Sequence, residues 1–586
     1  MKKLLLSPLF MLFIGFSLIS SAAFAGSWRD KIDAQLYEKA VQGGRQECLV
    51  VMTGKADFSG IRLPDKKADK GAFVFNRLKA FAEDRQRPIQ EFLRGRQIAF
   101  TSFFIVNAIY LKADLGLLEE IAQRADVQRI DPNPWVEQDM PREIPANARN
   151  VEWGVAKILA DSVWSMGITG QGVIIGGQDT GVEWDHSLIK SRYRGWVNET
   201  PDHNYNWHDA IHALSPINND PDTSATNNPC GLNSKVPCDD NNHGTYTIGI
   251  VLGDDGAGNQ TGVAPGATWI ACRNMDRGSG SPATYIEGFQ WFLAPTDVDG
   301  NNPNPAMAPH VINNSWSCPE SEGCNPGNWD LMEEAVENLR TAGVVVIVSA
   351  GNEGPNCHTI DAAPAIFSGA FAVGATRSND TIANFSSRGL VAADGSFRPK
   401  PDVSAPGVGI RSARRGNKFM TANGTSAAGP MVVGVVALML EANPLLEGKV
   451  ETIESILRAA VDPAYADQTC DEISGETFPN PMVGYGRINA LTAVEMALDV
   501  NISDTSENVL PDIKISPNPF REEVKFEIPT AGEVALSVFD VSGRRLTGTT
   551  SKAETFTVNL GRLPSGVYFY EIRQQGRTWT GKLVKL

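Results

Sequence analysis

The chain has 586 residues, of which 42% are hydrophobic and 20% are charged. These proportions are typical of globular proteins and exclude a mainly disordered, collagen-like or multi-span membrane chain, and the length predicts several domains. With 68 acidic and 52 basic side chains the net charge is −16, which argues against nucleic acid as a partner. Most of the acidic excess lies between residues 141 and 510, so the middle of the chain differs in character from both ends.

Residues 1–25 have the pattern of a signal peptide. Lys2 and Lys3 precede an apolar run over residues 4–19, and Ala23-Phe24-Ala25 supplies the small residues of a cleavage site. A membrane anchor is the alternative, but the run is short for a span and is interrupted by Ser and Pro. We therefore expect a protein that leaves the cytoplasm and is either secreted or displayed at the cell surface.

The eight cysteines favour disulfides, because the chain is expected to be exported. Two pairs lie close in sequence within loops rich in Gly, Pro, Asn and Ser, and their spacing does not fit a metal-binding knuckle. A third pair is a candidate long-range bridge. The three pairs are Cys230 with Cys238, Cys318 with Cys324, and Cys357 with Cys470. Cys48 and Cys272 lie in apolar, strand-like runs, where a buried free thiol is expected.

The first globular segment, residues 26–145, is predicted to be a small α+β unit. Its apolar runs predict strands and its charged or periodic stretches predict helices. The predicted strands are 48–52, 103–110 and 127–130, and the predicted helices are 73–99 and 117–124.

The second segment, residues 146–498, alternates apolar, β-branched runs with helices. The predicted strands include 172–177, 267–272, 311–313 and 344–349. Such alternation indicates a parallel sheet covered by helices on both faces, so the predicted fold class is α/β. Residues 499–510 are polar and aperiodic, as expected of a linker. Residues 511–586 alternate apolar and polar side chains between Gly and Pro turns, which predicts a small β-sandwich.

Four residues of the middle segment suggest chemistry. Asp179 and Asn352 follow predicted strands, and His243 and Ser426 precede apolar helical runs. In an open α/β sheet such positions meet at the carboxyl ends of the strands. An acid, an imidazole and a hydroxyl are the three parts that acyl transfer needs. Taken singly, each has a plainer interpretation, as a turn residue, a polar residue at a helix start or a helix N-cap, but their order and placement favour one joint site.

On its motifs, the middle segment resembles the subtilisin-like serine proteases, or subtilases, over essentially all of residues 150–497. Asp179-Thr-Gly, His243-Gly-Thr and Gly424-Thr-Ser426-Ala-Ala-Gly-Pro correspond to the three family motifs. The resemblance implies Ser426 as nucleophile, His243 as general base and then acid, and Asp179 as the carboxylate that orients it. It implies Asn352 as a donor to the oxyanion. In its amino-acid sequence, the segment most resembles the bacillopeptidase F-like branch of the family.

The resemblance also implies how substrate is held. The family clamps a protein or peptide substrate as an added strand between two extended segments, here Gly278-Ser279-Gly280 and Ser315-Trp316-Ser317. It implies a monomeric endopeptidase that needs no cofactor for catalysis.

The flanking segments resemble accessory parts of exported proteases. Residues 26–145 resemble the inhibitory propeptide of the family, which implies a self-processing zymogen whose own propeptide is a binding partner. Residues 511–586 resemble a type IX secretion sorting domain, through Ser516-Pro-Asn-Pro-Phe520, Leu563-Pro-Ser-Gly-Val-Tyr568 and a basic end. That resemblance implies an outer-membrane secretion machinery as a second partner.

The segment departs from the family pattern at two positions. Tyr246 stands where a second histidine is usual, and Leu188 stands where many members place a calcium-binding aspartate. We therefore predict no metal ligand at the usual site. The acidic loop 254–259 could hold a hard cation, although such loops are more often simply solvated.

Two other classes of protein are alternatives to a serine protease. Asp179-Thr-Gly is also the signature of aspartic proteases, but these need a second such loop, which the sequence lacks. A catalytically inactive, surface-displayed binding protein on a subtilase scaffold is the alternative function. Finally, Glu353 and Asp361 suggest a preference for basic or neutral residues before the scissile bond, unless both carboxylates are solvated rim charges.

Overall fold

A computed structural model describes the chain in two compact units, which divide between Val500 and Asn501. The predicted signal peptide and most of the predicted linker lie outside the described residues. The described residues are 28–59, 61, 63–138, 140, 144–145, 151–218, 228–500, 514–518, 520–528, 534–539, 545–553, 555–574 and 577–585.

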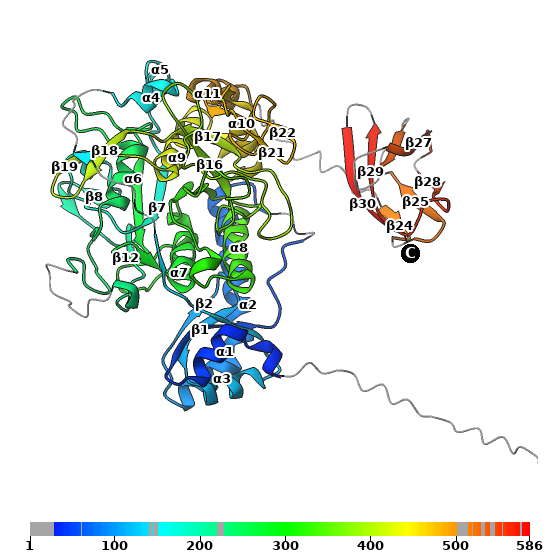
Figure 1. Ribbon diagram of the computed structural model, residues 1–586, viewed down its shortest axis with the longest axis horizontal. Helices are drawn as coiled ribbons and strands as arrows, with labels where there is room; N and C mark the ends of the chain where they lie inside the picture. The colour runs from blue at the N-terminus through cyan, green and yellow to red at the C-terminus, as the bar shows by residue number, and fades with distance from the viewer. Residues whose placement is uncertain are drawn as a thin grey trace, which may run out of the picture. The chain divides into compact units, whose positions relative to one another are not determined.

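Residues 28–138 form a lobe at one end of the first unit, called here the N-terminal lobe (Figure 1). Its four antiparallel strands run in the order β2-β3-β1-β4, and a core of apolar side chains joins them to three helices. The elements are α1 (Ala34–Val41), β1 (Gln46–Met52), α2 (Lys67–Gly95), β2 (Phe100–Phe103), β3 (Ala108–Ala113), α3 (Leu115–Ala122) and β4 (Val127–Pro132).

A nine-stranded sheet forms the centre of the first unit. Every neighbouring pair is parallel except the last, β20 and β23. In spatial order the strands are β10 (Trp207–Asp209), β11 (Thr268–Arg273), β7 (Ile174–Asp179), β14 (Val311–Asn314), β15 (Val345–Ser349), β16 (Phe371–Thr376), β17 (Val403–Pro406), β23 (Arg487–Ile488) and β20 (Val461–Asp462). The predicted parallel α/β sheet is thus confirmed.

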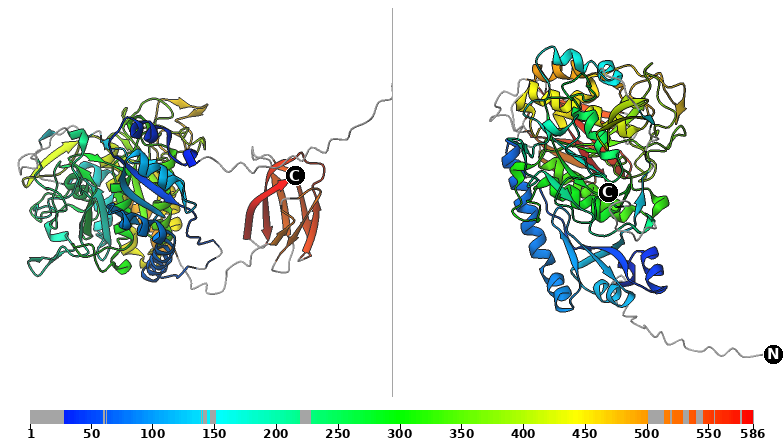
Figure 2. Two further views of the ribbon diagram at one scale, coloured as in Figure 1. Left: turned by 90° about the horizontal axis from the view of Figure 1, so that it is seen from below. Right: turned by 90° about the vertical axis from the view of Figure 1, so that its left-hand side faces the viewer.

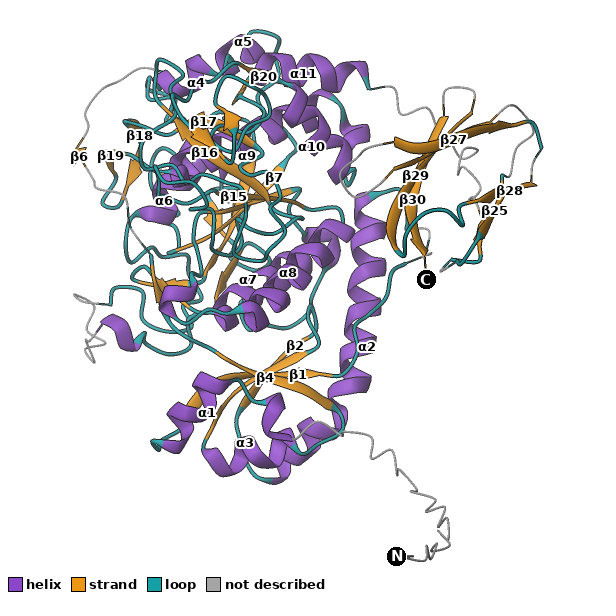
Figure 3. Ribbon diagram, turned by 45° about the vertical axis from the view of Figure 1, so that its right-hand side comes forward, coloured by secondary structure: helices purple, strands orange, loops and turns teal. Residues whose placement is uncertain are grey.

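Helices cover both faces of this sheet, as two adjacent glycines of β7 illustrate. A Cβ at Gly176 would meet Phe292 of α7 (Pro282–Leu293), whereas one at Gly177 would meet Ile248 of α6 (His243–Leu252). Successive residues of a strand point to opposite faces, so α7 and α6 lie on opposite sides of β7. The remaining helices are α4 (Trp153–Lys157), α5 (Ala160–Trp164), α8 (Pro326–Thr341), α9 (Thr425–Ala442), α10 (Val450–Ala459) and α11 (Ala490–Asp499). Figure 3 shows α7 and α8 between the large sheet and the N-terminal lobe.

The N-terminal lobe packs against the rest of the first unit through α2 and through a turn. In the right-hand view of Figure 2, α2 leaves the small sheet and runs along the side of the unit. There Lys67 Nζ donates to the carbonyl of Ala308 (2.9 Å), and Lys70 Nζ donates to the carbonyl of Gly448 (2.7 Å).

The single strand predicted over residues 103–110 is wrong, because β2 and β3 are joined by a turn at Phe104–Asn107, called here the docking turn. Gln290 Oε1 of α7 accepts from the N–H of Phe104 (2.6 Å), and Asn338 Nδ2 of α8 donates to the carbonyl of Ile105 (2.7 Å). Ile105 and Val106 are fully buried in the core that α7 and α8 share. The apolar run therefore reflects burial against another lobe rather than a continuous strand.

Helix α9 is long and apolar enough to cross a membrane by composition, with a mean hydropathy of 1.6, and 89% of it is buried in the fold. It packs on α6, α11 and strands β14 to β17. Residues 514–585 form the second unit, with sheets β24-β25-β28 and β27-β26-β29-β30 sharing one apolar core. Its strands are β24 (Lys514–Ser516), β25 (Glu523–Glu527), β26 (Val534–Phe539), β27 (Arg545–Ser551), β28 (Thr555–Asn559), β29 (Gly566–Gln574) and β30 (Arg577–Lys585).

The three predicted disulfides are formed, and their Cα–Cα separations of 5.6 to 5.7 Å are ordinary. Cys48 and Cys272 are free and buried, as predicted. Burial raises the pKa of both thiols, so neither is a reactive thiolate at neutral pH.

Candidate active site

Asp179 and His243 form a buried pair at the end of β7 and the start of α6. His243 Nδ1 lies 2.7 Å from Asp179 Oδ1 and 2.9 Å from Oδ2, and both side chains are almost fully buried. The N–H of Thr180 donates to the same carboxylate at 2.8 Å. Burial alone would lower the pKa of His243, but the Asp179 carboxylate outweighs it, and the pKa stands above its usual range. Nδ1 therefore bonds to Asp179, and Nε2 remains available to accept a proton.

A second carboxylate, Asp239, fixes the loop that carries His243. Asp239 is buried and accepts hydrogen bonds from two side-chain hydroxyls and three backbone N–H groups. The donors are Thr180 Oγ1 (2.9 Å), Thr245 Oγ1 (2.6 Å) and the backbone N–H groups of Asn241 (2.9 Å), Asn242 (3.1 Å) and Thr245 (3.0 Å). Since Thr180 is the residue after Asp179 and Thr245 is the second residue after His243, Asp239 ties the two halves of the pair together. Sequence analysis missed this role, although an acid four residues before His243 was visible.

Ser426 lies in the first turn of α9 and lines the same cavity as His243 and Asn352. The cavity has a volume of about 350 Å³. The N-cap of α9 is Gly424, without a side-chain cap, so the plainer interpretation of Ser426 as a helix cap does not hold. A serine in the first turn of a helix lies at the positive end of the helix dipole, which favours developing negative charge.

Asn352 is oriented by the residue that precedes Ser426. Its Oδ1 accepts from the N–H of Thr425 (2.9 Å) and from Thr425 Oγ1 (3.0 Å). Because both acceptor positions of the amide oxygen are used, Nδ2 is the free end of the side chain, and the residue lines the cavity. This is the arrangement expected of a donor to an oxyanion.

The two predicted substrate-binding segments border one cleft, and a strand of the same chain lies in it. In β5 (Val136–Glu137), Glu137 pairs with Ser279 and Val136 pairs with Gly280 of β13 (Ser279–Gly280), antiparallel. The N–H of Gln138 continues the ladder by donating to the carbonyl of Gly278 (3.0 Å). Ser315, Trp316 and Ser317 line the cavity on the other side. All six predicted positions therefore border the cleft.

Farther along the chain, β6 (Ile144–Pro145) pairs with β19 (Lys418–Ala422), which leads directly to Ser426. Glu137 of β5 and the adjacent Gln138 thus line the cavity that Ser426 lines, whereas β6 pairs with the strand that precedes Ser426.

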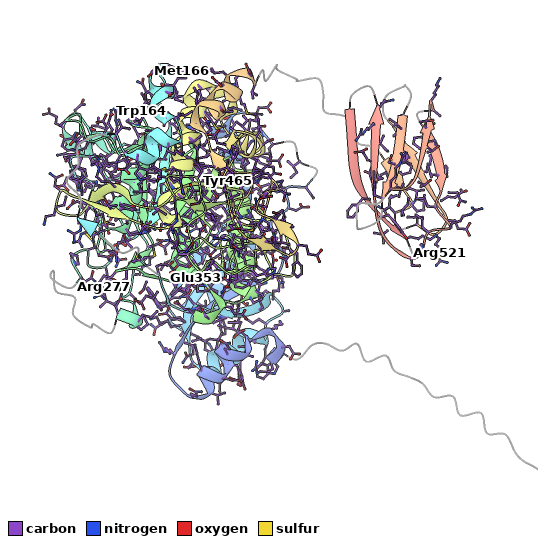
Figure 4. All side chains as sticks on the ribbon, turned by 45° about the horizontal axis from the view of Figure 1, so that its top comes forward. Trp164, Met166, Arg277, Glu353, Tyr465 and Arg521 are labelled. Atoms are coloured by element: carbon purple, nitrogen blue, oxygen red, sulfur yellow. A yellow bond between two sulfur atoms is a disulfide. The ribbon has the colours of Figure 1, made fainter. Side chains whose placement is uncertain are left out.

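Glu353 and Asp361 also line this cavity, and among its described lining residues none is Lys or Arg. Figure 4 labels Glu353, which follows Asn352, and Arg277, which precedes Gly278.

Tyr246 and Leu188, the two departures from the family pattern, are both buried side chains in the structure. Tyr246 is fully buried, and its hydroxyl donates to the carbonyl of Ile410 (2.9 Å), so it connects α6 to β18 (Ile410–Arg414). Leu188 is also fully buried and offers no ligand atom. In the loop 254–259, Asp254 and Asp255 accept from backbone N–H groups of the loop itself. Across the described part of the chain, no cluster of His, Cys, Asp and Glu has the geometry of a metal site.

The family model described as "Subtilase family" matches residues 170–486, more than half of the chain. The chain belongs to the subtilase family. A second model, "Secretion system C-terminal sorting domain", matches residues 514–586 of this subtilase. Such a tail directs export across the outer membrane, to the medium or the cell surface.

Three relatives show how far the likeness extends. The subtilase is 33% identical over 456 residues to "Bacillopeptidase F" of Bacillus subtilis (strain 168), covering 73% of this chain and 29% of that protein. It is 33% identical over 256 residues to "Serine protease AprX" of the same organism, covering 39% and 55%. It is 29% identical over 298 residues to "Subtilisin Savinase" of Lederbergia lenta, covering 51% and 87%. The chain thus spans less than a third of the first relative but most of the third.

Proposed function

We propose that this subtilase is an exported serine endopeptidase, made as a zymogen that processes itself. The observation that carries the proposal is the convergence of Ser426, His243 and Asn352 on one cavity, with the His243–Asp179 pair behind it. The family membership and the relatives named as proteases support it.

In the proposed mechanism, Ser426 Oγ attacks the carbonyl carbon of the scissile bond while His243 Nε2 takes the hydroxyl proton. Asp179 holds the imidazole by Nδ1 and stabilises the imidazolium that forms. Asn352 Nδ2 donates to the oxyanion of the tetrahedral intermediate. His243 then protonates the leaving amine, which leaves an acyl-enzyme on Ser426, and water repeats the sequence to release the acid product.

We further propose that residues 26–145 are the propeptide, 146–498 the catalytic domain, 499–510 a linker and 511–586 the sorting domain. Support comes from β5, whose Glu137 lines the cavity, and from β6, which pairs with the strand that precedes Ser426. A strand held in this way inhibits the enzyme until it is cut. The partners are then protein or peptide substrates, the propeptide itself and the secretion machinery of the outer membrane.

For the residue before the scissile bond we propose a basic or neutral side chain, since Glu353 and Asp361 line the cavity without a lysine or arginine among the described lining residues. Cleavage of a peptide library tests this preference, and strong selection of acidic residues there would contradict it.

Fluorophosphonate labelling tests the function directly, because only a base-activated serine reacts. The matured protein should be labelled, and Ser426→Ala should abolish both labelling and peptide hydrolysis and should leave the propeptide attached. An unlabelled but folded wild-type protein would instead favour an inactive, surface-displayed binding protein.

A further inference from the structure

The side chain of Gln138 is bound in the cleft by four hydrogen bonds. Its Nε2 donates to the carbonyl of Ser317 (2.7 Å) and to the hydroxyl oxygen of Tyr285 (3.2 Å). Its Oε1 accepts from the N–H of Ser317 (2.8 Å) and from Ser317 Oγ (3.4 Å). A primary amide has two N–H donors and one carbonyl oxygen with two lone pairs, so every hydrogen-bonding position of this amide is used.

The groups that bind the amide are held rigidly. Tyr285 is fully buried and stacks on Trp316, with ring centroids 3.8 Å apart and planes 12° apart. A Cβ at Gly280 would lie 2.5 Å from the Tyr285 hydroxyl oxygen, so only glycine allows the phenol to reach this point. Cys318, which follows Ser317, is fixed by its disulfide to Cys324 and by a backbone hydrogen bond to Ala363 (2.8 Å). The subsite is therefore formed before a ligand enters.

Gln138 also enters the cleft as a substrate residue would. Its backbone N–H donates to the carbonyl of Gly278 at the end of the β5–β13 ladder, and Gln138 lines the cavity together with Ser426. Its side chain therefore shows which chemical group the cleft accepts at that position of an extended peptide.

We propose that Tyr285 and Ser317 form an amide-binding subsite that selects glutamine on the N-terminal side of the bond to be cut. The inference rests on the proposed endopeptidase function and narrows its substrate class. A glutamate would place a second acceptor against the Ser317 carbonyl and the Tyr285 oxygen, where the bound Nε2 is a donor. A methionine has a similar length but would leave the Ser317 N–H and carbonyl without partners.

The competing explanation is that the amide stands in for peptide backbone. Ser317 offers one N–H and one carbonyl, the pair that a neighbouring strand would use. In a true substrate these groups would then bind the backbone, and the side chain at the position of Gln138 would not matter.

Four synthetic peptides with the sequence of residues 134–147 separate the two explanations, since they differ only at position 138, as Gln, Glu, Met or Ala. For the enzyme matured from the full-length chain, we expect kcat/KM to fall by about tenfold or more from Gln to Glu and from Gln to Met. Equal values for all four peptides would overturn the subsite and leave the protease function intact. Absence of both cleavage and fluorophosphonate labelling would instead refute the proposed function.

Variants of the enzyme then assign the preference to Tyr285. Tyr285→Phe should lower the ratio of kcat/KM between the Gln and Met peptides by several-fold, and a purely structural defect would slow both peptides alike and leave the ratio unchanged. Tyr193→Phe is the matched control, since Tyr193 is another buried tyrosine, and it pairs with His203 outside the cavity. An unchanged ratio in Tyr285→Phe, or an equal fall in Tyr193→Phe, would overturn the assignment.

Discussion

Asp239 shows how one buried carboxylate can hold both members of the Asp179–His243 pair in place. It accepts hydrogen bonds from the residue after Asp179, from the second residue after His243, and from the loop between. Its charge also contributes to the raised pKa of His243, after the larger effects of burial and of Asp179. We infer that Asp239 is a positioning residue, which acts on the reaction only through His243 and Asp179.

Asp239→Asn should lower kcat/KM and move its pH dependence. A general base works only when neutral, so kcat/KM should rise with pH through the pKa of His243, which lies above the usual value of about 6.5. Removing the charge of Asp239 should shift this midpoint to lower pH. Asp185→Asn, which removes the same charge from an exposed position shortly after Asp179 in the chain, should leave the midpoint in place. A pH–rate profile identical to that of wild type in Asp239→Asn would contradict the role.

Asn352→Ala should reduce kcat by about 10²–10³ with little change in KM, because its amide bonds the oxygen only as charge develops. The measurement is steady-state hydrolysis of one peptide, with exposed Asn356→Ala as control. A large rise in KM at unchanged kcat would show that Asn352 binds the ground state instead.

At the scale of elements, the docking turn joins the N-terminal lobe to α7 and α8. Its backbone hydrogen bonds and the burial of Ile105 and Val106 make one apolar core from two lobes. In uncleaved Ser426→Ala protein, Ile105→Ala should lower the free energy of unfolding by about 2–5 kcal/mol, because it leaves a cavity in this core. The temperature of the first unfolding transition should fall accordingly. Glu83→Ala, at an exposed position of α2, should change it little. If both variants had the same first unfolding temperature, the docking turn would contribute nothing to docking.

Strands β5 and β6 predict where the chain is cut. Since β5 ends at Glu137, Gln138 extends its ladder, and β6 begins at Ile144, the bond that faces Ser426 should lie between residues 138 and 144. Mass spectrometry of the matured protein should therefore find an N-terminus from Asp139 to Ile144, which would move the proposed propeptide boundary a few residues before 145. An N-terminus after Ile144 would mean that β5 and β6 do not mark the cut.

At the scale of the whole molecule, residues 501–586 form a separate compact unit with a core of their own. Deleting 511–586 should trap active, processed protease in the periplasm, with kcat/KM on small peptides within about twofold of the full-length value, because domains fold independently.

Deleting 26–140 should allow export from the cytoplasm but stall folding, since a parallel sheet has many non-local contacts. Cell fractionation and peptide hydrolysis measure both outcomes. Normal secretion with lost hydrolysis after the first deletion would make the tail a part of the enzyme.

The sequence by itself determined the α/β class, four strands of the large sheet, the two disulfides that close short loops and the four candidate catalytic residues. These follow from local patterns, because apolar runs, caps and motifs are properties of neighbouring residues. Only the tertiary structure decided the rest. It interrupted the run at 103–110 with the docking turn at Phe104–Asn107, because that turn is buried by α7 and α8, more than 170 residues away in sequence. It brought Asp239 between two motifs and placed Gln138 against Tyr285 and Ser317, since contacts between distant residues depend on how the elements pack and leave no periodic trace in the sequence.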